Sequence, residues 1–161
     1  SRFVNRTSTL YGAVQPARYT RRVETSRKTQ DVRLHFDWAA NRIQARDNQA
    51  QATLPLSPGV VDPLSLNLAV MRDLQRGRLP EHYTLVEETE LKTYQVRKEG
   101  EETLDTPLGK LRAVRISQSK PGKTRITTFW FAPDLHYLPG RVAQEKKGKE
   151  ELRMEIRAVE R

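Results

Sequence analysis

The sequence predicts a mainly β protein: a curled antiparallel sheet, or incomplete β-barrel (half-barrel), with one covering α-helix. Three observations lead to this prediction. Apolar and polar residues alternate with a period of two in several segments, turn-forming residues separate these segments, and only residues 63–76 have a convincing helical period. With 161 residues, the chain fits a single domain, residues 1–161, built around one modest core.

The first part of this domain, residues 1–53, is expected to form basic strands. The chain is strand-like from Ser1, and residues 18–25 alternate apolar with charged side chains. Residues 32–38 alternate more cleanly, and residues 42–46 return after a turn at 39–41. These features predict a hairpin with one apolar face.

The second part, residues 54–80, is expected to be a linker and the helix. Residues 54–59 contain two prolines and are interpreted as an ordered connection. Asp62 is suited to cap the helix and Pro63 to occupy its first position, and Gly77 ends it. The apolar stripe contains Leu64, Leu68, Met71 and Leu74.

The third part, residues 81–161, is expected to be an antiparallel meander. Its predicted strands are 82–87, 91–98, 101–106, 109–119, 123–132, 141–147 and 150–160. Consecutive bulky aromatics, Phe129 to Phe131, must point to opposite faces of a strand, so both faces there need cover. The predicted core contains Leu34, Phe36, Trp38, Leu68, Met71, Val114, Ile116, Trp130, Leu152, Met154 and Ile156.

Positive charge is concentrated near the N-terminus. The formal net charge is +9, and residues 1–46 contain ten Lys and Arg against three acids. Such a surface attracts anions, including nucleic acid, lipid head groups and acidic polysaccharide. The candidate anion-binding residues are Arg18, Arg21, Arg22 and Arg33. The alternative is that these arginines only solvate the sheet and protect its edge.

The chemistry of the side chains favours no enzyme. The chain has no cysteine, and its three histidines lie on different predicted elements. His35 and Asp37 are two residues apart on one strand, but two donors do not make a metal site. No nucleophile elbow or phosphate-binding glycine loop occurs. We therefore expect no catalytic residue, no cofactor and no metal, and no apolar run is long enough to span a membrane.

Three segments carry a resemblance to a known family: residues 62–69, residues 100–115 and residues 125–142, together with the strand Leu34-His-Phe-Asp-Trp. They resemble the bacterial family of domain of unknown function 3108. The resemblance implies a periplasmic protein with a half-barrel similar to that of lipoprotein carriers. Members of that family usually have a signal peptide and further N-terminal strands, so we expect a chain that lacks the family's N-terminal portion.

Three functions remain open at this point. The favoured one is a non-enzymatic cell-envelope protein that binds lipid, lipoprotein or another amphiphile on a concave sheet face. Its candidate ligand-binding residues are Phe129, Trp130, Phe131, Leu68, Met71 and Tyr94. The second is a polyanion or nucleic-acid binder that uses the basic N-terminal part. The third is an interaction module whose exposed edge strand pairs with an envelope protein or a second copy of the chain.

Overall fold

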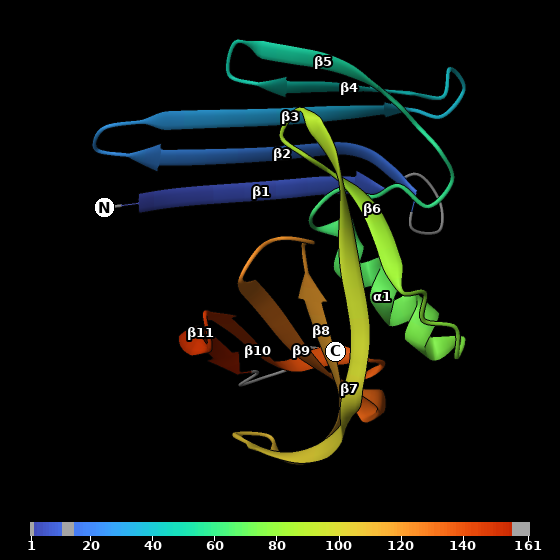
Figure 1. Cartoon of the computed structure of the whole chain (residues 1–161), viewed down its shortest axis with the longest axis vertical. Helices are drawn as coiled ribbons and strands as arrows, with labels where there is room; N and C mark the ends of the chain where they lie inside the picture. Colours follow the sequence, from blue (N-terminus) through green and yellow to red (C-terminus); the bar gives the residue numbers. More distant parts are fainter. Residues whose placement is uncertain (1, 11–14, 156–161) are drawn as a thin grey trace. The chain divides into compact units, whose positions relative to one another are not determined.

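The computed structural model describes residues 2–10 and 15–155. Contacts divide the chain into two compact units: unit 1 is Ser1–Ala69 with Tyr83–Lys92, and unit 2 is Val70–His82 with Thr93–Arg161. The predicted fold class is confirmed, because the described residues form two open antiparallel sheets and one α-helix (Figure 1). The interpretation as a single domain stays a prediction.

Unit 1 contains a five-stranded antiparallel sheet in the order β1-β2-β3-β4-β5 (Figure 1). Its strands are β1 (Arg2–Leu10), β2 (Pro16–Thr25), β3 (Thr29–Asp37), β4 (Arg42–Asp47) and β5 (Ala50–Pro55). The predicted hairpin is β3–β4. The prediction that Leu54 and Pro55 belong to a connection was wrong, because they end β5. Proline is tolerated here since β5 is an edge strand with a neighbour on only one side.

One face of this sheet forms the core of unit 1. Tyr19, Val32, Leu34, Phe36 and Ile43 are buried there, and Trp38 packs against them while its indole N–H donates to the carbonyl oxygen of Pro16 at 2.8 Å. Each fully buried large apolar side chain contributes about 1.5–3 kcal/mol. The alternate positions of the same strands are mostly exposed. The sheet therefore has one dry and one wet face, as the period of two predicts.

The helix α1 (Ser65–Gln75) lies within the predicted residues 63–76, but it begins two residues after Pro63, which was expected at its first position. The fully buried Asp62 carboxylate accepts the backbone N–H groups of Leu64 and Ser65 at 2.9 and 2.8 Å. The predicted apolar stripe was wrong at Leu68, which is 43% exposed. Apolar residues occupy a wide arc of the helix, and packing selects which of them are buried: Leu66, Ala69 and Val70. No helix among the described residues has the length and apolar character to cross a membrane.

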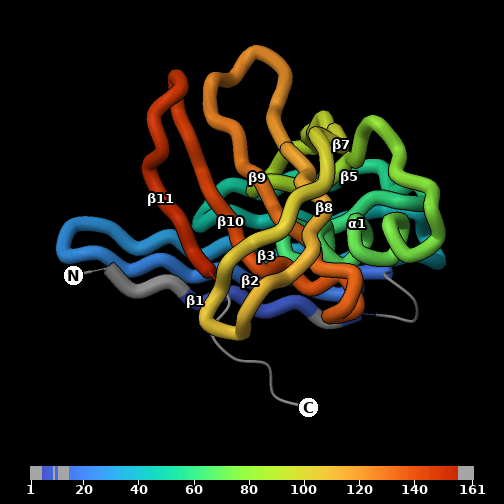
Figure 2. Tube along the Cα trace, turned by 90° about the horizontal axis from the view of Figure 1, so that it is seen from below, coloured from blue at the N-terminus to red at the C-terminus, as the bar shows by residue number. Residues whose placement is uncertain are grey.

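The second sheet has six strands in the order β11-β10-β9-β8-β7-β6, and Figure 2 shows β8 to β11 side by side. The strands are β6 (His82–Glu87), β7 (Glu90–Thr106), β8 (Gly109–Ser119), β9 (Arg125–Ala132), β10 (Leu138–Lys146) and β11 (Lys149–Glu155), and a short 3-10 helix, η1 (Pro133–Leu135), joins β9 to β10. In unit 2, the Gln75 side chain donates to the His136 carbonyl just after η1, so the end of α1 contacts this connection.

The strand β7 corrects the prediction of two separate strands at 91–98 and 101–106. It is one strand whose pairing with β8 shifts between Lys98 and Gly100. Gly100 has a φ of 154°, which favours glycine. A bulge at a glycine bends a strand without ending it, so a turn residue in the sequence here marks a kink.

The aromatic run on β9 has both of its faces covered, as predicted. Phe129 and Phe131 stack with ring centroids 5.6 Å apart on one face, and Phe131 is fully buried. Trp130 lies on the other face in a cluster with Leu104 and Ala113. This strand therefore contributes to packing on both sides.

The strand β11 corrects the predicted core. Leu152 and Met154 are 45% and 54% exposed, and Ile156 lies outside the described residues. Alternation predicted an inward face, but β11 is an edge strand that pairs only with β10. Among the other predicted core residues, Val114, Ile116 and Trp130 are buried and Met71 is half-buried.

Candidate functional site

A hollow of about 570 Å³ lies on the wet face of the sheet in unit 1. We call it the basic hollow. Its lining residues are Arg18, Thr20, Arg33, Leu34, His35, Gln44, Ala45, Arg46, Gln51, Ala52 and Thr53. Among these described residues there are three arginines and no aspartate or glutamate, so the hollow carries positive charge.

Strand register brings these side chains together. Arg33 on β3 lies directly opposite Arg46 on β4, and Arg46 lies opposite Gln51 on β5. One row further along, Arg18 lies opposite His35. Residues directly opposite have Cβ atoms about 4.5–5.5 Å apart. Arg33 and Arg46 are therefore direct neighbours, and Arg18 lies diagonally to Arg33 on the same surface, although Arg18 and Arg46 are 28 positions apart in the sequence.

The charges in the hollow are only partly compensated. Arg33 donates to the Asp31 carboxylate from Nε and Nη2 at 3.2 and 3.3 Å, which raises the pKa of the Arg33 guanidinium. Arg46 Nε donates to the carbonyl oxygen of Asn48 at 2.8 Å. This acceptor is neutral, so the bond does not neutralise the charge of Arg46. Like charges directly opposite on a sheet are destabilising. A bound anion between Arg33 and Arg46 would relieve this repulsion.

The structure divides the four predicted anion-binding arginines. Arg18 and Arg33 line the basic hollow. Arg22 is on the same wet face but pairs with Glu24 at 2.7 Å. Arg21 has the opposite parity on β2, and its Nη1 donates to Gln30 Oε1 at 3.0 Å. Two of the four are thus brought together, and these assignments as binding residues stay predictions.

Sequence reasoning missed Arg46 and the two glutamines of the hollow, Gln44 and Gln51. The alternation of β4 placed Arg46 on the wet face, but only the register of the β3–β4 hairpin places it opposite Arg33. That register depends on the turn after Asp37, where Asp37 Oδ1 accepts the N–H of Ala40 and Asn41 has a φ of 56°. The length of this turn, residues 38–41, was the feature of the sequence that could have predicted the pairing of Arg33 with Arg46.

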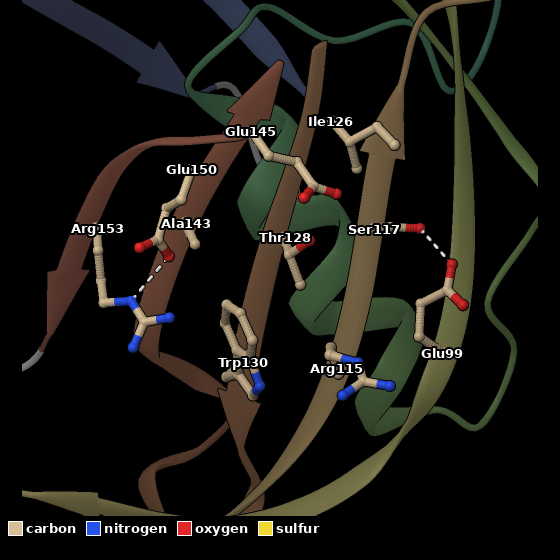
Figure 3. Close-up of a pocket in the computed structure, with 10 residues that line it drawn as sticks. All are labelled: Glu99, Arg115, Ser117, Ile126, Thr128, Trp130, Ala143, Glu145, Glu150 and Arg153. Atoms are coloured by element: carbon tan, nitrogen blue, oxygen red, sulfur yellow. Dashed lines mark hydrogen bonds and ion pairs between the residues drawn. The ribbon is translucent and has the colours of Figure 1, made fainter. Parts of the chain in front are cut away.

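A second hollow, of about 400 Å³, lies on one face of the sheet in unit 2 (Figure 3). We call it the mixed hollow, because its charged lining residues are Glu99, Glu145, Glu150, Arg115 and Arg153. Glu150 pairs with Arg153 at 2.9 Å, and Glu99 accepts the hydroxyl of Ser117 at 2.8 Å. Two of the charged lining residues thus pair with each other, and the Glu99 carboxylate is held by a hydroxyl.

Trp130 lines the mixed hollow and is held firmly. Its indole N–H donates to Glu102 Oε1 at 2.7 Å, and Glu102 Oε2 accepts from Arg115 at 2.9 Å. The Arg141 guanidinium lies over the ring, 5.4 Å from its centroid. These contacts fix the ring from several sides.

The other predicted ligand-binding residues lie in different surroundings. Phe129 and Phe131 belong to the buried face of β9 opposite to Trp130, and Tyr94 is half-buried with the Lys120 ammonium 5.7 Å from its ring centroid. Leu68 belongs to unit 1 and Met71 to unit 2. A common apolar site of these residues stays a prediction.

Comparison with known proteins adds a fold and a family. A crystal structure of a beta-barrel-like protein of domain of unknown function DUF1849 from Brucella abortus is similar, with a TM-score of 0.56, 9% sequence identity, and coverage of 96% of this chain and 75% of that one. At this identity the likeness concerns the fold alone. No curated protein matches the chain. The model of the family "protein of unknown function (DUF3108)" matches residues 4–157, so the chain belongs to this family.

Proposed function

We propose that the protein is a non-enzymatic binding protein of the bacterial cell envelope that holds an anionic group in the basic hollow. The anionic group belongs either to a soluble polyanion or to the head group of an amphiphile. The observation that carries the proposal is the convergence of Arg18, Arg33 and Arg46 on one hollow whose described lining contains no carboxylate. The periplasmic location follows the export that the family resemblance implies.

The lining supports an anionic group over an apolar one. Leu34 and Ala45 are buried on the dry face, so they contribute little side-chain surface to the hollow. Apart from Ala52, the remaining side chains are polar and can donate hydrogen bonds. Guanidinium groups bind oxyanions with two parallel hydrogen bonds, which makes arginine well suited to this task. An amphiphile would therefore use this hollow for its head group.

The same lining gives less support to a nucleic-acid binder. Proteins that bind single strands without sequence preference stack bases on aromatic side chains. Among the described residues that line the basic hollow, the imidazole of His35 is the one aromatic ring. Tyr19, the tyrosine next to Arg18, is buried on the dry face.

Binding to long-chain polyphosphate, measured by calorimetry over a series of salt concentrations, tests the proposal. Affinity is expected to fall steeply with salt, because exposed charges are screened within about 10 Å at 0.1 M. Each of the variants Arg18→Gln, Arg33→Gln and Arg46→Gln is expected to weaken binding about tenfold, since hydrogen bonds to charged groups contribute about 1.5–3 kcal/mol.

The matched control is Arg27→Gln, which removes one charge from an exposed position in the β2–β3 turn, outside the hollow. Equal losses in Arg27→Gln and in the hollow variants would mean attraction by net charge alone and would overturn the site. Vesicles with and without anionic phospholipid separate the two sources of the anion. Fractionation of cells that express the full-length gene tests the periplasmic location.

A further inference from the structure

We propose that the ligand of the basic hollow is an anionic sugar. Neutral side chains of β4 and β5 bind the hydroxyl groups of this sugar, and the arginines bind its anionic group. This inference rests on the proposed function and names its ligand class. The feature that carries it is the group of neutral polar side chains around Arg46: Gln44, Gln51 and Thr53.

Register places these neutral groups at the β4–β5 side of the charge. Gln44 lies opposite Thr53, and Arg46 lies opposite Gln51, so the four side chains form a compact square on two strands. All four positions have the parity of the wet face, and all are exposed. Arg18 and Arg33 on β2 and β3 lie at the other side. Arg46 thus lies among the neutral polar side chains, and Arg18 and Arg33 carry the remaining positive charge of the hollow.

The chemistry of the neutral end matches a sugar. An amide side chain offers a carbonyl acceptor and two N–H donors, and a threonine hydroxyl both donates and accepts. Sugar hydroxyls also donate and accept, so they satisfy both functions of these side chains. Inorganic phosphate accepts through most of its oxygens and has only one or two hydroxyl donors near pH 7, so it matches the acceptor oxygens of Gln44 and Gln51 less well than a sugar does. A base or acyl chain would need aromatic or apolar lining.

The size of the hollow is also larger than a single oxyanion requires. Ligand sites have volumes of about 300–1,000 Å³, and the basic hollow has about 570 Å³. Its length across the sheet spans the four strands β2 to β5, which lie about 4.7–4.9 Å apart. A phosphate between Arg33 and Arg46 leaves room over Gln44, Gln51 and Thr53 for an attached ring.

Three probes separate the charge from the sugar: inorganic phosphate, glucose and glucose 6-phosphate. Their dissociation constants are measured on the complete chain by NMR titration of backbone amides at constant ionic strength. Glucose 6-phosphate is expected to bind about tenfold more tightly than inorganic phosphate, since two or three added hydrogen bonds contribute this factor. The perturbed amides are expected in β2 to β5.

The double variant Gln44→Ala/Gln51→Ala is expected to remove the tenfold advantage and to weaken phosphate binding by a smaller factor, because Arg18, Arg33 and Arg46 remain. Both residues are exposed, and surface substitutions of this kind leave the fold intact. The matched control is Gln49→Ala, an exposed glutamine in the β4–β5 turn outside the hollow, which is expected to keep the advantage.

The outcomes separate this inference from the proposed function. Equal binding of phosphate and glucose 6-phosphate, lost in Arg46→Gln, would overturn the sugar while anion binding stands. An advantage that survives Gln44→Ala/Gln51→Ala would overturn the role of these two glutamines. If the arginine variants bound every anionic probe as tightly as the unchanged protein does, the proposed function itself would be overturned, and this inference with it.

Discussion

The two sheets differ in whether their second face is exposed to solvent or covered by packing. In unit 1, β3 buries Val32, Leu34 and Phe36 and exposes Arg33 and His35 on the other side. In unit 2, β9 ends in four buried residues, Phe129 to Ala132, and its adjacent aromatics cover both faces. A strand with strict alternation keeps one face available to solvent, whereas a strand with adjacent bulky residues uses both faces for packing.

The two hollows differ in the same way. The basic hollow is lined by three arginines without a described carboxylate, whereas the mixed hollow pairs its own charges, for example Glu150 with Arg153. Opposite charges that already pair gain little from a ligand, because the ligand must replace existing contacts. In the basic hollow, Arg33 pairs with Asp31 but Arg46 donates to a neutral carbonyl oxygen, so an anion between them adds a contact that the protein itself does not supply. The basic hollow therefore gains more from a bound anion than the mixed hollow does.

The largest expected effect concerns Phe131, which is fully buried. Phe131→Ala is expected to lower the free energy of unfolding by about 3–5 kcal/mol, because it removes buried surface and leaves a cavity. Urea denaturation measures the loss, and hydrogen exchange tells whether it is confined to the second sheet. Phe131→Leu, which keeps more of the volume, is expected to lose less. A loss below about 1 kcal/mol would contradict the two-sided packing of β9.

A second large effect is expected at Asp62, whose carboxylate caps α1 and accepts the hydroxyls of Ser8 and Ser65 at 2.6 and 2.9 Å. Asp62→Ala is expected to cost about 2–4 kcal/mol, because it removes a helix cap and the carboxylate acceptor of the buried Ser65 hydroxyl and the half-buried Ser8 hydroxyl. Thermal and urea unfolding measure it. Asp62→Asn keeps one acceptor oxygen and should lose less. Equal losses in the two variants would mean that the cap contributes nothing.

An intermediate effect is expected for Trp130→Phe. It removes the hydrogen bond from the indole N–H to Glu102, which is partly exposed, so the expected loss is about 1–2 kcal/mol. A double-mutant cycle with Glu102→Ala, read by urea unfolding, isolates the pair. Simple additivity of the two single losses would show that the bond is not stabilising.

A pH-dependent effect is expected at Tyr19. Burial raises the pKa of its hydroxyl above the ordinary value of 10.0, against the opposing charges of Arg6 and Arg21. The unfolded state therefore loses this proton at a lower pH than the folded state, and stability falls as pH rises from about 10 toward the folded pKa. Tyr19→Phe should flatten this part of the stability curve measured by urea unfolding. Parallel curves for the two proteins would contradict the assignment.

The smallest effect on stability is expected for Arg46→Gln on the wet face. The free energy of unfolding should change by no more than about 0.5 kcal/mol, and at low salt it should rise, because Arg33 loses an opposing like charge. Chemical denaturation at two salt concentrations measures this. A loss above about 1 kcal/mol would mean that the bond from Arg46 to the Asn48 carbonyl is structural. The site would then be inseparable from the fold.

The sequence by itself determined the local elements of this protein. The bounds of β6 and β8 agree with the predicted strands 82–87 and 109–119, because alternation and tight-turn residues act over short distances. Alternation also placed Arg18 and Arg33 on the face opposite to Leu34. The capping of α1 by Asp62 was likewise visible, since a cap involves residues only two or three positions away.

Tertiary structure decided which of these faces are covered and which residues meet. Leu152 and Met154 alternate as well as any residues in the chain, yet β11 is an edge strand and both are exposed. Periodicity states that a side chain shares a face with its second neighbour, but not what lies over that face. Arg46 meets Arg33 through the β3–β4 register, and Gln51 joins them through β5. The basic hollow is thus a property of strand pairing, because contacts across strands depend on register over the whole sheet.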